Sequence, residues 1–161
     1  YGIMYVDEDG NKKGCVICHS SIGSIERWMY ALLEEALKKD KPSFPFWLSP
    51  TQVRLIPVGE EFLKDCRSIA DALAVRVDID DTDDSVGKKI RNAEREWVNM
   101  IVVFGDKERT SGKLPVRLRS GEMKIMTLEQ LVEETDRLSS GYPRASLPLP
   151  MLLSKRPVFR G

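Results

Sequence analysis

Apolar and polar residues follow one another along this chain in two different periods, and each period predicts a type of element. Apolar residues at every second position are typical of strands, and apolar residues three or four positions apart are typical of helices. Residues 1–6 and 14–19 are short apolar runs on either side of DEDGN, whose Asp-Gly pair favours a tight turn. After Ser24, a residue type that favours the N-cap, residues 28, 32 and 36 are apolar at helical spacing. We therefore expect a β-hairpin and then a helix that ends near Lys39.

A proline-rich stretch separates this first part from the rest. The segment KDKPSFPFWLSP holds three prolines, which break regular structure and predict a linker. Strand and helix patterns then alternate: the expected strands are 52–58, 74–79, 100–104, 114–118 and 123–125, and the expected helices are 62–73, 86–97 and 128–138. This alternation predicts a three-layer α/β fold, in which helices flank a mixed sheet that carries a hairpin at one edge. The tail has four prolines and no period, so we expect it to cover the surface without forming an element.

The overall composition is that of an ordinary globular domain. The 161 residues carry no net charge, and 42% of them are apolar, enough for a buried core. No apolar run is long enough to cross a bilayer and no leader opens the chain, so we expect a cytoplasmic protein without membrane segments. Because the chain opens with Tyr1 inside a strand pattern, we also expect it to be part of something longer.

The distribution of charge is more informative than the sum. Residues 85–124 contain ten Lys and Arg but only five Asp and Glu, a local excess of positive charge. A basic half beside an acidic loop suits an RNA-facing surface, and an ordinary solvated surface is the alternative. The acidic loop does not match the calcium-binding loop of an EF-hand. If that loop began at Asp78, Asp83 would occupy the position that requires glycine and Lys89 the position that requires glutamate. The aspartates of this loop are Asp78, Asp80, Asp81, Asp83 and Asp84.

The cysteines and the single histidine form weak motifs. Cys15, Cys18 and His19 match the haem-attachment pattern C-x-x-C-H, but their apolar neighbours favour buried thiols. A structural zinc site that adds Cys66 to these three residues would use every soft ligand of the chain. In a strand, however, Cys15 and Cys18 point to opposite faces, which disfavours that site.

Two longer motifs resemble parts of one enzyme family. HSSIGSIERW at 19–28 resembles the last signature of a class II aminoacyl-tRNA synthetase active site, and DSVGKKIRNAEREWVNMIVVFGDKE at 84–108 resembles an anticodon-binding domain that follows it. WLSPTQVRLIPV and the ending PLPMLLSKRPVFRG are similar to segments of archaeal-type threonyl-tRNA synthetases. The resemblance implies the end of a class II catalytic domain at 1–40, a linker at 41–50, and an anticodon-binding domain with a C-terminal tail at 51–161.

The resemblance also implies an enzyme as the intact protein. That enzyme would be a homodimer that joins threonine to tRNA(Thr) with ATP, Mg²⁺ and Zn²⁺. Its ATP contact would be Arg27, at the start of a helix, and one of its zinc ligands would be His19. We expect this chain alone to bind RNA without catalysing. The alternative is a stand-alone RNA-binding or regulatory paralogue, and the length of the open reading frame distinguishes the two.

The anticodon stem-loop of tRNA(Thr) is the partner that the resemblance implies for the second part. Asp83, Glu108 and Arg117 are the residues implied to meet anticodon bases. Carboxylates accept hydrogen bonds from base edges, and an arginine donates in a fork. Basic side chains around the polar side of one helix would suit phosphates, namely Lys88, Lys89, Arg91 and Arg95.

Overall fold

The computed structural model describes residues 2–14 and 23–157, which belong to two compact units, Tyr1–Glu35 and Ala36–Gly161. In the first unit, β1 (Met4–Val6) pairs antiparallel with β2 (Lys12–Gly14), so the expected hairpin is confirmed. Its turn holds Gly10 at φ +82°, in the left-handed region that glycine adopts readily. The helix α1 (Ile25–Leu37) follows at the expected place, and the units divide within it.

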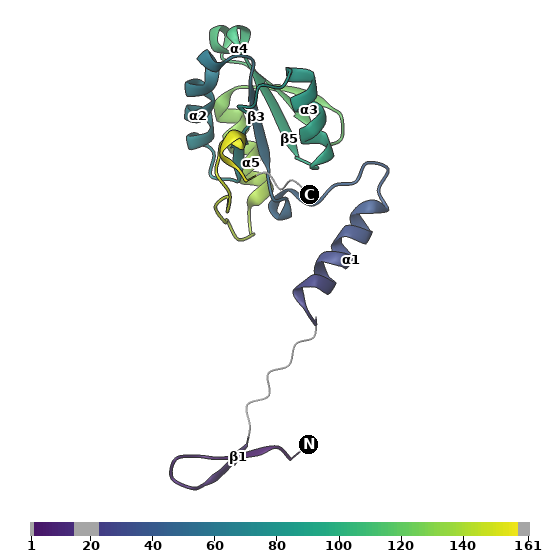
Figure 1. The fold of residues 1–161 in the computed structure, drawn as a ribbon, viewed down its shortest axis with the longest axis vertical. Coiled ribbons are helices and arrows are strands. Elements are labelled where there is room, and N and C mark those ends of the chain that lie inside the picture. The colour runs from purple at the N-terminus through teal and green to yellow at the C-terminus, as the bar shows by residue number, and fades with distance from the viewer. Residues whose placement is uncertain (1, 15–22, 158–161) are drawn as a thin grey trace. The chain divides into compact units, whose positions relative to one another are not determined.

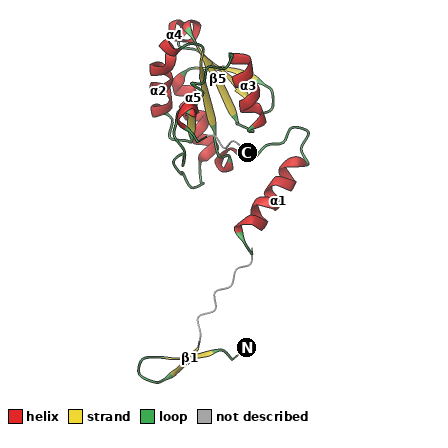
Figure 2. Cartoon of the chain, viewed as in Figure 1, coloured by secondary structure: helices red, strands yellow, loops and turns green. Residues whose placement is uncertain are grey.

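The second unit contains the predicted α/β fold. Its five-stranded sheet has the order β4-β3-β5-β6-β7, in which β3 pairs parallel with β4 and β5 while β5, β6 and β7 pair antiparallel. The strands are β3 (Val53–Pro57), β4 (Val77–Ile79), β5 (Met100–Phe104), β6 (Leu114–Leu118) and β7 (Met123–Met126). The helices, drawn in red in Figure 2, are α2 (Leu63–Ala72), α3 (Val86–Arg95), α4 (Asp106–Ser111) and α5 (Leu128–Ser139). The predicted fold class is therefore confirmed.

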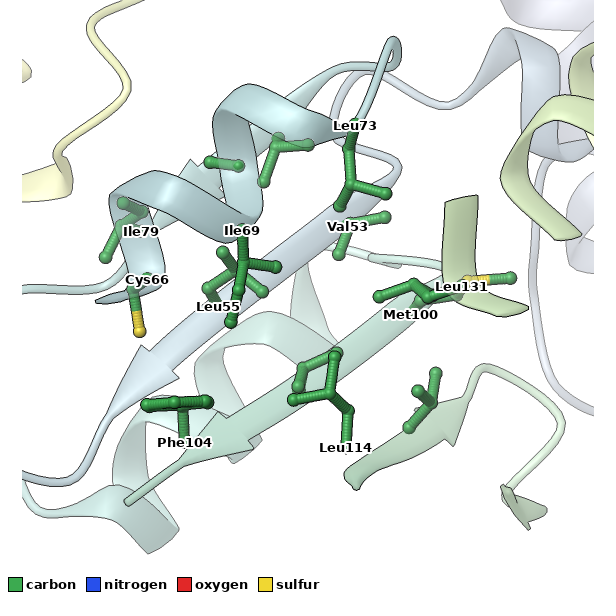
Figure 3. Close-up of a cluster of buried hydrophobic side chains, with 14 of the residues drawn as sticks. Val53, Leu55, Cys66, Ile69, Leu73, Ile79, Met100, Phe104, Leu114 and Leu131 are labelled. Atoms are coloured by element: carbon green, nitrogen blue, oxygen red, sulfur yellow. The ribbon is translucent and has the colours of Figure 1, made fainter. Parts of the chain in front are cut away.

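Alternation along the strands divides the core between two faces of the sheet. Side chains of one parity, such as Leu55 and Val102, form the larger cluster with α2 and α5 (Figure 3). Side chains of the other parity, such as Ile56 and Ile101, pack against Ala93 of α3. Helices therefore cover both faces of β3 and β5, as a three-layer arrangement requires.

A buried ion-pair network interrupts the apolar packing on the α3 face. Arg54 of β3 is fully buried, and its guanidinium donates from Nε and Nη2 to the two oxygens of Asp78 at 2.7 and 2.9 Å. The same Nη2 donates to Glu96 at 2.6 Å, and Thr51 donates to Asp78 at 3.1 Å. Burial alone would lower the pKa of Arg54, but the hydrogen bonds and charges of Asp78 and Glu96 outweigh it and raise that pKa. The guanidinium of Arg54 is thus charged and closely paired.

The linker is anchored to the second unit by side chains that donate to its main-chain carbonyls. Arg76 donates to the carbonyls of Trp47 and Ser49 at 2.6 and 2.8 Å. Arg119 donates from Nε to the carbonyl of Pro42 at 2.8 Å, and from Nη1 to that of Glu94 in α3. Gln52 and Asn99 hold Phe46 and Phe44 in the same way. The chain between Pro42 and Pro50 therefore follows a defined path on the domain.

The tail differs from its prediction over a short stretch. Leu153–Lys155 forms a turn of 3-10 helix, and Leu152 bridges to Ile79 at the edge of the sheet. The expectation of a tail without elements is wrong there, because β4 is an edge strand whose free backbone groups accept a further segment.

Cys66 gives a prediction that tests the packing of α2. Burial raises the pKa of its thiol to about 12, with a smaller contribution from the charge of Asp65, compared with 9.0 for a free thiol. At about pH 8 this makes the thiolate about a thousandfold scarcer. We expect iodoacetamide to label Cys66 at a negligible rate in the folded chain and rapidly in urea, as measured by peptide mass spectrometry. Equal rates in both conditions would show that α2 opens readily.

Candidate nucleic-acid interface

The carboxyl ends of the three parallel strands meet at one edge of the sheet, and a hollow lies there. Because β3, β4 and β5 run in the same direction, the loops that follow them emerge side by side. The hollow has a volume of about 440 Å³. Pro57, Val58 and Leu63 form an apolar wall, the loop Asp81–Asp84 forms a polar wall, and Lys89 also lines the hollow. It is large enough for a planar base and offers both an apolar surface and polar groups.

Most aspartates of the acidic loop are already engaged within the protein. Asp78 pairs with Arg54, and Asp80 accepts from the hydroxyl of Thr82 at 2.6 Å. The carboxylate of Asp81 accepts from Ser154, and that of Asp84 accepts from Lys88 at 2.7 Å. Asp83 alone among the five is exposed and has no such partner within the residues that the structure describes. The loop therefore presents one available carboxylate beside the hollow.

Lys89 does not lie where the sequence analysis placed it. It is 6% exposed, and its Nζ donates to the main-chain carbonyl of Asp80 at 3.0 Å. The expectation that Lys89 lies on the polar outer side of its helix is wrong, because it shares the inward face with Val86, Ile90 and Ala93. Its spacing of three from Val86 and four from Ala93 is the signal that identifies this face. An ammonium has three donors, so Lys89 keeps two beyond the bond to Asp80.

The other basic residues of α3 lie outward. Lys88 is exposed and forms an i,i+4 ion pair with Asp84. Arg91 and Arg95 are also exposed. These side chains can meet a phosphate without desolvating a core group.

Glu108 stabilises the start of α4 and lies at the same sheet edge. Its Oε2 accepts from the backbone N–H of Gly105 at 2.9 Å, which satisfies a donor that the helix start leaves open. Gly105 packs closely on the hollow's wall, because a Cβ there would lie 3.2 Å from Cγ2 of Val58. Glu108 is half-buried, and its second carboxylate oxygen remains for another donor. Asp83 and Glu108 are therefore both at the edge where β3, β4 and β5 end.

Arg117 lies elsewhere on the sheet. It pairs with Ile101, three residues before the end of β5, so it is about 10 Å from the carboxyl edge along the strand. Its side chain has the parity of the α3 face, where Met123 and Ile125 of β7 are 48% and 60% exposed. Arg117 therefore belongs to the open face of β6 and β7, away from the edge that holds Asp83 and Glu108.

Comparison with known proteins identifies the family of this chain. The family described as "Anticodon binding domain" matches residues 52–138. The chain belongs to this family. A threonine–tRNA ligase from Thermococcus onnurineus is 48% identical over all of the chain, which covers 27% of that relative.

Two solved structures resemble a large part of this chain. The RNA-binding domain of a threonyl-tRNA synthetase from Cryptosporidium parvum has a TM-score of 0.55 and 27% identity, over 65% of this chain and 26% of that one. A threonyl-tRNA synthetase structure from Aeropyrum pernix has a TM-score of 0.60 and 25% identity, over 77% and 32%. The resemblance to threonyl-tRNA synthetases is therefore confirmed. The chain spans about a quarter of the length of the curated relative above.

The unit that precedes the anticodon-binding domain contains the remaining predicted site residues. Arg27 lies in the first turn of α1, is exposed, and has its side chain beside Gly23, whose φ is +80°. His19, Cys15 and Cys18 lie outside the described residues. Over 2–14 and 23–157, the structure has neither a group of three metal-binding side chains nor a helix long and apolar enough to cross a membrane.

Proposed function

We propose that this chain is the anticodon-reading part of a threonine–tRNA ligase and that its partner is the anticodon stem-loop of tRNA(Thr). The identity to a ligase over the full chain supports the ligase. The hollow at the carboxyl edge supports the reading of a base, because it combines an apolar wall with the free carboxylate of Asp83 and the buried ammonium of Lys89. This hollow is the observation that carries the proposal.

Each predicted contact has a chemical role in this proposal. A base that enters the hollow packs against Pro57 and Val58 and donates an amino proton to Asp83, while Lys89 donates to a ring nitrogen or carbonyl. The free oxygen of Glu108 accepts from a second base. Arg117 donates to a third base that lies on the open face of β6 and β7, where Met123 offers an apolar surface.

Phosphates then meet the outward side of α3. Lys88, Arg91 and Arg95 supply charge there, which strengthens binding to any RNA but carries no sequence information. Lys88 exchanges its ion pair with Asp84 for a phosphate, so its net contribution is reduced by the pair it gives up.

The first unit belongs, in this proposal, to the end of a class II catalytic domain at residues 1–40. Apolar side chains of α1 and the hairpin support this assignment, because Ile25, Met29 and Tyr30 are 76%, 57% and 64% exposed. Large apolar patches of this kind are typical of surfaces that pack against another part of a protein. The exposed guanidinium of Arg27 has the charge and fork geometry that suit a triphosphate. ATP, Mg²⁺, zinc at His19, the homodimer and the cytoplasmic location are parts of the same proposal.

Base reading is tested by substitutions that keep the fold. We expect Glu108→Gln, which retains an acceptor for Gly105, and Arg117→Ala to weaken binding to the cognate stem-loop by about 1–3 kcal/mol. Asp83→Asn should also weaken cognate binding, because its amide NH₂ can lie where the amino group of the base needs an acceptor. Binding to stem-loops with altered anticodons should change little, so discrimination falls. Fluorescence anisotropy with short labelled RNAs measures both affinities.

Lys88→Ala is the matched control for these variants. It should weaken cognate and non-cognate RNA alike and reduce the slope of log K against log salt by about one. Equal losses on both RNAs for the Glu108 or Arg117 variants would remove that residue from the base-reading set.

A further inference from the structure

The C-terminal segment Met151–Arg156 (yellow in Figure 1) meets the edge strand β4 at its last residue, Ile79. The backbone N–H of Ile79 donates to the carbonyl of Met151 at 2.9 Å, and Leu152 bridges to Ile79 in parallel. Met151 and Leu152 also pack against the larger core cluster. Met151 and Leu152 therefore extend the sheet beside the last residue of β4, next to the aspartates that follow it.

Ser154 engages that loop directly. Its backbone N–H donates to Oδ1 of Asp81 at 2.9 Å, and its hydroxyl donates to Oδ2 of the same carboxylate at 2.5 Å. The 3-10 turn Leu153–Lys155 aims both donors of one residue at one acceptor. Because both oxygens of Asp81 are engaged, Asp83 remains the available carboxylate of the polar wall.

Arg156 provides a second attachment of the segment, at Asp78. Nη2 of Arg156 is 2.9 Å from Oδ2 of Asp78, within the buried network around Arg54. Arg156 Nε also donates to the carbonyl of Pro150 at 2.9 Å, which closes the segment on itself. Ile79, Asp81 and Asp78 are thus each held by a different residue of the same short segment.

From this convergence we infer that Met151–Arg156 is a strap that positions the Asp81–Asp84 wall for RNA, with Ser154 as its positioning residue. The inference rests on the proposed function for its RNA partner. Without the Ser154 hydroxyl, Oδ2 of Asp81 loses its hydrogen bond while Oδ1 keeps the backbone N–H of residue 154. The loop is then held by one bond fewer, and more of its ordering must occur when RNA binds. A loop ordered in advance binds more tightly, because that ordering does not oppose association.

The central test compares Ser154→Ala with Ser154→Thr, which keeps the hydroxyl, and with Ser146→Ala, an exposed serine of the same tail. In the 161-residue chain we expect Ser154→Ala to weaken cognate stem-loop binding about 5- to 20-fold, because the less ordered loop must be ordered on association. Binding to altered anticodons should weaken less, and the melting temperature should fall by a few degrees at most, because the core contacts are kept. Ser154→Thr and Ser146→Ala should behave as the parent chain does.

Hydrogen exchange in the free protein provides a readout that does not depend on RNA. Amides 81–84 should exchange faster in Ser154→Ala while the core strands keep their protection. Asp81→Asn should act like Ser154→Ala, and the double variant should add little to either. Unchanged exchange and affinity in Ser154→Ala would overturn the strap, and so would a lower melting temperature with discrimination retained.

Failure of the proposed function has a different signature. If the parent chain does not bind the stem-loop, the RNA part of the inference fails with that function. The exchange rates of amides 81–84 then still decide whether the strap orders the loop.

Discussion

Asp78→Ala is expected to lower the free energy of unfolding of the domain by about 3–5 kcal/mol. Asp78 is fully buried and holds both Nε and Nη2 of Arg54, so its removal leaves a buried guanidinium with Glu96 as its remaining acid. Arg156 also loses its ion-pair partner, and the hydroxyl of Thr51 loses its acceptor. Urea unfolding followed by circular dichroism measures the loss.

A double variant without either charge separates the effect of ion pairing from that of packing. Arg54→Met with Asp78→Leu replaces the pair by apolar groups, and we expect it to recover a large part of the stability that Asp78→Ala loses. Arg67→Ala, an exposed arginine of α2, is the matched control and should change stability by less than about 0.5 kcal/mol. A loss below about 1 kcal/mol for Asp78→Ala would mean that water reaches Arg54 readily.

Arg27→Ala in the intact ligase that we propose is expected to lower threonine-dependent ATP–pyrophosphate exchange by about 10²- to 10³-fold. The reason is loss of a planar cation at the triphosphate, which a lysine replaces incompletely. The 161-residue chain alone should show no exchange above background, since it spans about a quarter of its curated relative.

Anticodon binding provides the control for this second result. Arg27→Ala should leave the affinity for the anticodon stem-loop unchanged, because Arg27 belongs to a different compact unit from the proposed RNA contacts. Exchange by the isolated chain, or full activity of the Arg27→Ala ligase, would contradict the role given to Arg27.

Elements with a strong hydrophobic period were predicted almost to the residue. β5 and β6 have the predicted bounds, and α5 ends one residue later than expected. Burial of one face requires apolar residues at a regular spacing, so that spacing predicts the element from the sequence. The short helix α4, DKERTS, was missed because it has six residues, no buried side chain and therefore no period.

The candidate site was less predictable because burial there follows from pairing. Arg54 alternates with Val53 and Leu55, which reads as a polar outward position, yet it is buried because Asp78 and Glu96 neutralise it. The aspartates 78–84 looked equivalent, but some of their partners are more than 70 residues away, such as Ser154 for Asp81 and Arg156 for Asp78. Long-range pairs of this kind leave no local pattern in one sequence. Glu108 was identified through family resemblance, whereas its capping bond followed from its position three residues after Gly105.

The linker path on the second unit depends on which atoms hold it. Arg76, Arg119, Asn99 and Gln52 all donate to main-chain carbonyls of residues 42–50, and every residue type has such a carbonyl. Substitutions at an exposed linker position such as Pro50 therefore leave these acceptors in place, whereas one change at Arg76 removes several bonds at once. The route of this segment is thus encoded largely in the folded domain that it leads into. Its exposed residues are open to change, whereas Phe46 and Ser49 are buried.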